Sequence, residues 1–261
     1  MVTTLLTTGE PDLERTMRVA AISDIHGNRF ALDAALADIE KRAIDKIVCL
    51  GDTVQGGPQP VETVERLRKL GSPVVLGNAD AWLLNEEADS AEPTSEEQRE
   101  VRAWTISKLS RADLDFLRSY KPTVEIKLDA HQRLLCFHGS PTSYDDILLP
   151  DSPKERWDQL LGPYSPAIMA GGHTHTQQVR RIRGGLFFNP GSIGVAYDVW
   201  LPKEEFRTEP WAEYAILSFE DGYSSLEFRR AYYDLEGLIQ TIKSSGRPHA
   251  DHIISDYMKG C

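Results

Sequence analysis

Cysteine is scarce in this sequence, and its few cysteines are not spaced for metal or redox chemistry. Only three occur among 261 residues. Cys49 and Cys136 lie inside apolar runs, Cys261 is the last residue, and no CxxC pair occurs. We therefore interpret the cysteines as inert, mostly buried thiols. Their number argues against a disulfide framework and predicts a reducing compartment, for which the cytoplasm is the default.

Long apolar runs are also missing. No stretch approaches the roughly 18 apolar residues that a membrane span requires. The first residues, MVTTLLTTGEPDLERT, have neither the basic start nor the apolar core of a signal peptide. We expect residues 1–16 to form a flexible lead-in and the protein to be cytoplasmic, without a membrane partner.

Positive charge is in deficit. The sequence has 29 Lys and Arg against 40 Asp and Glu, which gives a formal net charge of −11. We find no basic stripe, so broad binding to nucleic acid or to anionic membranes is not expected. The hydrophobic fraction of 41% is ordinary for a soluble globular protein. The oligomeric state is left open.

What the sequence does contain is an alternation of strand-like and helix-like segments from Arg18 onward. The strand-like runs are RVAAIS, DKIVCLGD and PVVLGN. The helix-like runs between them are FALDAALADIEKRA and PVETVERLRKL. This order predicts parallel strands joined by right-handed helical crossovers.

The second half predicts further strands and a few helices. Residues 80–120 read as mostly helical and begin with an acidic stretch, which we interpret as a solvated face, with a docking surface as the alternative. A hairpin follows, then a helix opened by Ser152, then five short strands and a helix at LEGLIQTIK. We predict one domain over residues 17–245, a polar tail over 246–261, and an α/β fold with two β-sheets packed face to face and helices outside.

Candidate ligands follow apolar strand-like runs at five places. They are Asp24 with His26, Asp52, Asn78, His138, and His173 with His175. The carboxyl ends of strands are where open α/β sheets build their sites. Each position alone has a plainer interpretation, because a strand-end Asp is commonly a turn residue and a lone histidine is commonly a buried hydrogen-bonding group.

The set as a whole favours a metal centre. Carboxylate, amide and imidazole ligands without thiolates suit two borderline divalent ions, and Mn, Fe, Zn, Co and Ni all accept such ligands. Two ions bring a charge of +4, and Asp24, Asp52 and a hydroxide remove three, which leaves about +1 to attract a phosphate. The remaining histidines, His131, His249 and His252, we interpret as structural or solvated.

The ordered blocks DIHGN, GD, GNAD, HGSP, GGHTH and NPGSIG resemble the motifs of the calcineurin-like metallophosphoesterases. The similarity is greatest to the small bacterial and archaeal phosphodiesterase-like branch and extends from about Met17 to Phe228. It implies a four-layer αββα sandwich of two mixed β-sheets with a two-metal centre at one edge.

The resemblance also implies roles for individual residues. One metal would be held by Asp24, His26 and His175, and the other by Asn78, His138 and His173, with Asp52 bridging the two. Asp52, Asn78 and Asn28 would be catalytic, Asn28 by touching the substrate phosphate or orienting a ligand, although a plain turn role for Asn28 is an equal alternative. Asn189 and Ser192 would brace the histidine loop, again with a plain turn as the alternative.

The implied activity is hydrolysis of small phosphate esters by a metal-bridging hydroxide. Many relatives carry a histidine after the Asn of the third block to protonate the leaving group, whereas this chain has Ala79, so we expect phosphodiesters or activated esters as substrates. Asp80 and Tyr144 are the next candidates for a proton donor. The alternatives are a protein-interaction scaffold of the same fold and a phosphoprotein or monoester phosphatase.

The segment after NPGSIG departs from many relatives too. An arginine is common there in the family, whereas this chain reads VAYDVWLPKEEF. The longer, more aromatic loop means that substrate recognition cannot be copied from the family.

Overall fold

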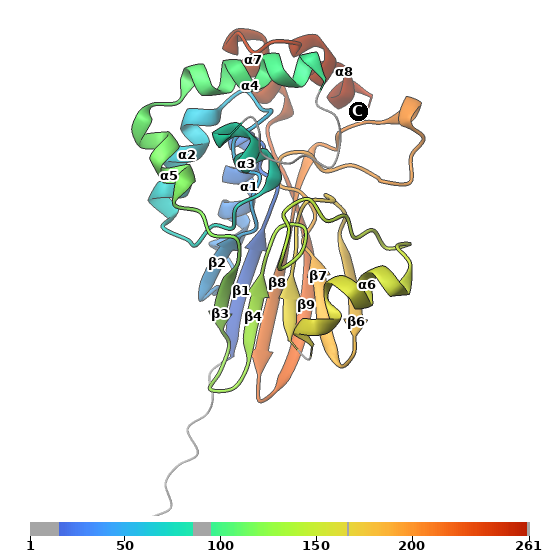
Figure 1. The fold of residues 1–261 in the computed structure, drawn as a ribbon. Coiled ribbons are helices and arrows are strands. Elements are labelled where there is room, and N and C mark those ends of the chain that lie inside the picture. The colour runs from blue at the N-terminus through green and yellow to red at the C-terminus, as the bar shows by residue number, and fades with distance from the viewer. Residues whose placement is uncertain (1–15, 86–94, 166, 260–261) are drawn as a thin grey trace, which may run out of the picture.

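The computed structural model describes residues 16–85, 95–165 and 167–259. Within these ranges two β-sheets pack face to face, with helices on the outer side of each (Figure 1). The fold is therefore the predicted four-layer α/β sandwich. All of the predicted lead-in 1–16 except Thr16, and Cys261, lie outside the described residues.

The first sheet has the strand order β2-β1-β8-β9. Its strands are β1 (Met17–Ile22), β2 (Lys46–Cys49), β8 (Trp211–Glu220) and β9 (Tyr223–Tyr232). β1 runs parallel to β2, with Ala20 opposite Ile47, and antiparallel to β8, with Ala20 opposite Ile216. The long β8–β9 hairpin completes a mixed sheet.

The second sheet has the strand order β3-β4-β5-β7-β6. Its strands are β3 (Val124–Lys127), β4 (Arg133–Cys136), β5 (Ile168–Ala170), β6 (Gln178–Ile182) and β7 (Gly185–Asn189). β4, β5 and β7 are parallel neighbours, and the antiparallel strands β3 and β6 form the two edges. The predicted hairpin of β3 and β4 is confirmed.

β1 is apolar at consecutive positions because both of its faces are covered. Val19 and Ala21 face the core between the two sheets, which also contains Phe188 of β7. Ala20 and Ile22 face the opposite way, into the core beneath the helices. Since successive strand residues point to opposite faces, a strand in the middle of a sandwich needs apolar side chains at every position.

Helices form the outer layers (Figure 1). The helices of the first half are α1 (Arg29–Ile39), α2 (Pro60–Leu70), α3 (Asn78–Leu84), α4 (Glu96–Lys108) and α5 (Arg111–Arg118). The later helices are α6 (Lys154–Leu160), α7 (Leu235–Ser245) and α8 (Ala250–Met258), with short 3₁₀ turns at Gly162–Tyr164 and Lys203–Glu205. On the far side of the second sheet, α6 packs Trp157 against Met169 and Phe187.

Some expected elements differ in detail. The run PVVLGN makes only isolated bridges, from Val74 to Cys49 and from Val75 to Lys121, and no strand of its own. Ser152 does not cap α6; its hydroxyl accepts from the amide of Leu149, and Pro153 occupies the cap position. These differences are local. They depend on which backbone groups of neighbouring loops lie within hydrogen-bonding distance.

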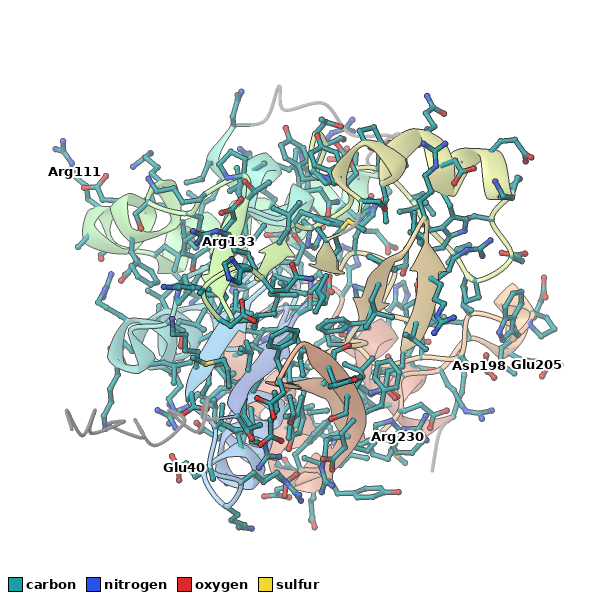
Figure 2. The ribbon with its side chains drawn as sticks, turned by 90° about the horizontal axis from the view of Figure 1, so that it is seen from below. Glu40, Arg111, Arg133, Asp198, Glu205 and Arg230 are labelled. Carbon is teal, nitrogen blue, oxygen red and sulfur yellow. The ribbon has the colours of Figure 1, made fainter. Side chains whose placement is uncertain are left out.

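The cysteine and membrane expectations can be compared with the structure. Cys49 and Cys136 are free and buried, and burial raises the pKa of both thiols, as expected of unreactive groups. Among the described helices, none has the length and apolar character needed to cross a membrane. Charged side chains such as those of Arg111 and Glu205 extend outward at opposite sides of the molecule (Figure 2).

Candidate metal centre

The predicted ligands meet where strands of both sheets end. From the first sheet, Asp24 follows β1 and Asp52 follows β2; from the second, His138 follows β4, and His173 and His175 follow β5. Asn78 opens α3, directly after the Val74–Val75 bridges. The two sheets therefore bring residues more than 100 positions apart in the sequence to one edge, as the strand-end pattern predicts.

Most of these ligands have an unusual backbone conformation. Five of the seven lie in the left-handed region: Asp24 (φ 54°), His26 (φ 48°), Asp52 (φ 54°), His173 (φ 70°) and His175 (φ 53°). Non-glycine residues rarely adopt this region, and each instance costs on the order of 1–3 kcal/mol. Such strain is typical of functional sites, where tight turns direct side chains inward.

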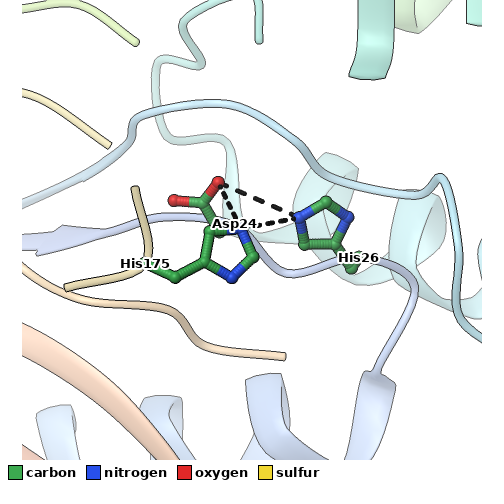
Figure 3. Close-up of side chains that lie close together, drawn as sticks. All are labelled: Asp24, His26 and His175. Carbon is green, nitrogen blue, oxygen red and sulfur yellow. Dashed lines mark hydrogen bonds and ion pairs between the residues drawn. The ribbon is translucent and has the colours of Figure 1, made fainter. Parts of the chain in front are cut away.

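Asp24, His26 and His175 form one compact group (Figure 3). Asp24 Oδ1 lies 3.3 Å from His175 Nε2 and 3.9 Å from His26 Nε2. The two Nε2 atoms are 3.2 Å apart. Three potential ligand atoms therefore face a common point.

The imidazole protons of this group are fixed by backbone carbonyls. His26 Nδ1 donates to Gln55 O at 2.8 Å, and His175 Nδ1 donates to Val195 O at 2.7 Å. Because a carbonyl only accepts, each neutral ring keeps its lone pair on Nε2. Two lone pairs at 3.2 Å repel one another unless a cation lies between them. A metal-binding histidine is characteristically oriented in this way, through its other nitrogen.

A buried oxygen supports the same conclusion. Asp24 Oδ1 has no hydrogen-bond partner in the structure, although Asp24 is fully buried. An unpaired buried carboxylate oxygen is costly, whereas coordination to a divalent ion would satisfy it. The donor set of this group therefore fits a borderline divalent ion.

Asp52, Asn78 and His138 form a second group beside the first. His138 Nδ1 donates to Leu50 O at 2.7 Å, which again leaves Nε2 directed at the site. That nitrogen lies 2.9 Å from Asn78 Oδ1 and 3.4 Å from Asp52 Oδ2. Asp52 Oδ2 is also 3.8 Å from His26 Nε2, so this oxygen lies between the two groups.

Two predicted ligands are placed differently from the simplest expectation. Asp24 approaches both groups, because its Oδ1 is also 3.9 Å from His138 Nε2. The ring of His173 lies beside that of His138, with centroids 5.1 Å apart. His173 nevertheless belongs to neither cluster of converging ligand atoms, which are Asp24 with His26 and His175, and Asp24 with Asp52 and His138. Its role as a ligand stays a prediction.

The electrostatics of the centre favour added positive charge. Burial alone would raise the pKa of Asp24, but His175, His138 and His26 outweigh it and hold the pKa well below its usual range. Burial opposes protonation of His138, yet Asp52 raises the pKa of that ring to about 10. In the protein alone the carboxylates therefore favour protonation of the neighbouring histidine rings. Metal ions would supply the same positive charge to the carboxylates.

Asp80 supports the centre from behind. It is fully buried and accepts from the amides of Asp52 and Thr53 at 2.8 and 2.9 Å. Burial and the neighbouring Asp52 charge raise the pKa of Asp80 to about 7. With these contacts Asp80 holds the Asp52 turn in place, and its burial keeps it from reaching a leaving group as a proton donor.

Asn189, the last residue of β7, braces the histidine loop, as one of the two sequence interpretations predicted, whereas Ser192 braces the turn at Asp24. Asn189 Nδ2 donates to Gly172 O at 2.6 Å and to Thr174 Oγ1 at 3.1 Å. Ser192 Oγ donates to Asp24 O at 2.9 Å. Gly172 is needed at this junction because a Cβ there would collide with the hydroxyl of Ser23.

Asn28 has structural contacts on all sides. Its Oδ1 accepts from the amide of Ala31 and so caps α1. Its Nδ2 lies 3.2 Å from Gly194 O and 3.2 Å from the hydroxyl of Tyr257. Asn28 also lines the cavity beside His26, so its contact with substrate stays a prediction.

Sequence reasoning missed the contribution of the C-terminal residues. Within the segment 246–261, interpreted as a polar tail, α8 forms and buries Tyr257, whose hydroxyl donates to Gly194 O at 3.0 Å. Arg247 donates from Nε to Gly56 O. The helical spacing of Ile253, Ile254 and Tyr257 was the available signal.

These C-terminal residues help to enclose a cavity of about 160 Å³ beside the centre. Its lining includes His26, Asn28, Arg247 and Tyr257. The predicted aromatic loop packs Tyr197 against His175, with ring centroids 5.4 Å apart. The centre thus has a cationic side chain and an aromatic ring as neighbours.

Comparison with known proteins shows the family. The model of the calcineurin-like phosphoesterase superfamily domain matches residues 17–222. Over 241 residues the chain is 30% identical to the uncharacterized protein MJ0912 of Methanocaldococcus jannaschii, covering 88% of this chain and 93% of that protein. It is 31% identical over 130 residues to the symmetrical bis(5'-nucleosyl)-tetraphosphatase of Baumannia cicadellinicola, covering 46% of this chain and 41% of that enzyme.

A solved structure shows the same architecture. The metallophosphoesterase from Sphaerobacter thermophilus aligns with a TM-score of 0.69 and 24% identity, over 94% of this chain and 99% of that one. The likeness at this identity concerns the fold. Together with the family match over most of its length, it shows that the chain belongs to the calcineurin-like phosphoesterase superfamily.

Proposed function

We propose that the protein hydrolyses phosphodiesters or activated phosphate esters with a centre of two divalent metal ions, and that it does so in the cytoplasm. The observation that carries this proposal is the convergence of carboxylate oxygens and imidazole Nε2 atoms from four strand ends. In three of the rings Nδ1 donates to a backbone carbonyl, which directs Nε2 at the centre. A set of side chains assembled for another purpose would not need this arrangement.

The residues divide into two ligand sets that share a carboxylate. Asp24, His26 and His175 would hold one ion, Asn78, His138 and His173 the other, and Asp52 would bridge them. When bound, such ions lower the pKa of a coordinated water and polarise the phosphoryl oxygens. The side chains of the protein contribute position and charge, since phosphoryl transfer requires little covalent assistance.

The cavity beside His26 is the proposed substrate site. Arg247 lines it and carries a positive charge close to where a phosphate group would approach the centre. Two of its nitrogens donate to backbone carbonyls, Gly56 O and Pro248 O, which holds the guanidinium in place. Arg247 would therefore help to bind the phosphate ester without belonging to the ligand set.

The preference for diesters and activated esters follows from Ala79. Its methyl group cannot donate a proton, and its amide donates to Asp52 Oδ1 at 2.9 Å. The adjacent Asp80 is buried behind the centre. A leaving group that departs readily as an anion is accordingly the best substrate.

The match to a tetraphosphatase supports adding dinucleoside polyphosphates to the substrate panel. It covers under half of each protein, so it does not select this substrate over other phosphodiesters. Nucleotide diesters, cyclic nucleotides and phospholipid-like diesters belong in the same panel.

The direct test is a hydrolysis assay with the purified protein. With Mn²⁺ we expect turnover of an aryl phosphodiester, and we expect a chelator to abolish it. The variant Asp151→Asn is a control, because Asp151 is an exposed carboxylate of the β4–α6 connection and belongs to neither group of converging ligand atoms. Lack of activity with every divalent metal across the panel would reject the enzyme and favour a protein-interaction scaffold of the same fold.

A further inference from the structure

A second cluster of metal-binding side chains lies between α4 and the start of α8. Glu97 and Glu100 are three residues apart on α4, and His249 and His252 are three residues apart where α8 begins. Figure 1 shows α4 passing alongside the C-terminal helices. The two pairs thus face each other from segments about 150 positions apart in the sequence.

Glu97 lies between the two histidines. Its Oε1 is 3.8 Å from His249 Nδ1, and its Oε2 is 3.4 Å from His252 Nδ1. One ligand atom from each of the three residues lies within 4.8 Å of the other two. Bonds of about 2.0–2.1 Å to a tetrahedral Zn²⁺ ion place its ligand atoms about 3.3 Å apart, so small side-chain rotations would complete the site.

Glu100 sets the orientation of His249. Its carboxylate Oε2 lies 2.8 Å from His249 Nε2, and since a carboxylate accepts, that nitrogen carries the proton. The lone pair of the neutral ring is then on Nδ1, which faces Glu97. A carboxylate that accepts from one nitrogen of a histidine while the other binds metal is the usual outer partner of a zinc ligand.

We propose that Glu97, His249 and His252 form a Zn²⁺ site, with Glu100 orienting His249. Two imidazoles and a carboxylate are ligands that Zn²⁺ prefers, and the exposed position leaves a fourth place for water. None of these residues belongs to the candidate metal centre, so the site is separate from the proposed catalytic ions.

The ion would fasten the C-terminal segment to α4. Arg247 lies two residues before His249 and lines the cavity beside His26. Tyr257, at the other end of α8, lines the same cavity. A bound Zn²⁺ would therefore hold a wall of the proposed substrate cavity in place, although the site itself does not depend on that function.

The test is the number of Zn²⁺ ions bound, measured by calorimetric titration and by metal analysis after gel filtration. The wild-type protein should bind one equivalent more than His252→Gln and than Glu97→Gln. His252 has 69% of its side chain exposed, so the first variant leaves the core intact. His131→Gln, at the exposed turn between β3 and β4, is the matched histidine control and should bind as the wild type does.

Glu100→Gln separates an orienting role from a ligand role. This variant should still bind the additional Zn²⁺ ion, but with an affinity about 10–100-fold weaker, the usual effect of losing a residue that orients a metal ligand. If wild type and His252→Gln bind equal numbers of Zn²⁺, the cluster is a set of ion pairs and the proposal is wrong. Because the comparison is a difference between variants, it is interpreted in the same way whether or not the candidate centre binds ions.

Discussion

At the scale of single residues, the backbone decides where the ligands point. The Nδ1 atoms of His26, His138 and His175 each donate to a main-chain carbonyl. Main-chain acceptors do not change on substitution, so the direction of each Nε2 lone pair is a property of the fold. The left-handed turns at Asp24 and Asp52 act in the same way on the carboxylates. Substitutions of the ligands themselves should therefore affect metal binding with little effect on folding.

Asp52→Asn tests this expectation. The amide removes the charge that lies 3.4 Å from His138 Nε2 and 3.8 Å from His26 Nε2, while its oxygen can still accept from Ala79. Losing a residue that only orients a metal ligand costs up to about 100-fold in affinity. Because Asp52 is proposed as a ligand itself, we expect a larger loss of metal affinity, and turnover should fall with it. Metal analysis and the assay measure both, and circular dichroism should show a folded protein. Normal turnover with both ions retained would contradict the bridging role.

Ala79→His tests the assignment of the leaving-group proton. A positioned acid contributes about 10²–10⁴-fold for poor leaving groups and little for nitrophenolate. In the wild type we expect rates to fall steeply as the pKa of the leaving group rises. The variant should accelerate alkyl esters selectively, provided that its imidazole reaches the leaving oxygen.

A shallow dependence in the wild type would contradict the absence of an acid and direct attention to Tyr144. Asp80 is a poor alternative, because it is fully buried and holds the amides of Asp52 and Thr53. Replacing Tyr144 by Phe would then be the informative comparison.

Most candidate ligands were predictable because they follow apolar strands, whereas Asn78 follows only the isolated bridges of Val74 and Val75. The sequence did not indicate which buried residues hold these ligands in position. The contact of Asp80 with Asp52 and Thr53 joins two loops across 27 and 28 positions, and nothing in the local pattern indicates it. The Glu97–His249 pairing likewise depends on how α8 returns to α4.

At the scale of elements, a charged network joins α1 to the β8–β9 hairpin. Asp38 of α1 accepts from the hydroxyl of Tyr214 at 2.6 Å and from Arg229 Nε at 3.2 Å. It also pairs with Arg42 one helical turn later. The hydrogen bond from Arg42 is the largest cause that lowers the pKa of Asp38, to about 2. This network fastens the outer helix to the first sheet.

Asp38→Asn should destabilise the protein in a pH-dependent way. A lowered pKa in the folded state means that the stabilisation is present above the unfolded pKa of about 3.9 and is lost as the pH falls through about 2. We expect a loss of about 1–2 kcal/mol in the free energy of unfolding at pH 7, shrinking below pH 4. Urea denaturation at several pH values measures it.

Asp115→Asn is the control for this experiment. Asp115 pairs with Arg118 on α5, but its side chain is 59% exposed, so its removal should change stability by less than about 0.5 kcal/mol. A loss for Asp38→Asn that is equally small would show that solvent screens the network.

Most elements were predictable because their apolar periodicity is set by burial. The covered faces of β1 and the spacing in α7 are visible in the sequence. The predictions were wrong where tertiary contacts determine the local structure. Val74 and Val75 form single bridges to Cys49 and Lys121, and the Ser152 hydroxyl accepts from Leu149 instead of capping α6. The helix α8 was missed because its apolar residues are few and its burial depends on packing against Leu238 and Ile242 of α7.

At the scale of the whole molecule, the candidate centre joins the two sheets. Asp24 and Asp52 follow strands of the first sheet, and His138 and His175 follow strands of the second. Elsewhere the sheets meet through apolar packing, such as Val19 with Phe188. Ions bound at this edge would therefore connect the two halves of the sandwich and would be lost when either sheet unfolds.

Removal of metal should accordingly lower the thermal midpoint of the whole domain. Ions that bind only the folded state stabilise it by about 2.7 kcal/mol at a free concentration 100-fold above Kd. For a protein of this size about 1 kcal/mol corresponds to about 2–4 °C, so a chelator should lower the midpoint by about 5–11 °C. Calorimetry with Mn²⁺ and with chelator measures the difference. His252→Gln should keep this shift and Asp52→Asn should lose most of it, because only the second variant lacks the carboxylate proposed to bridge the two ions. Equal midpoints with and without chelator in the wild type would mean that no ion joins the sheets.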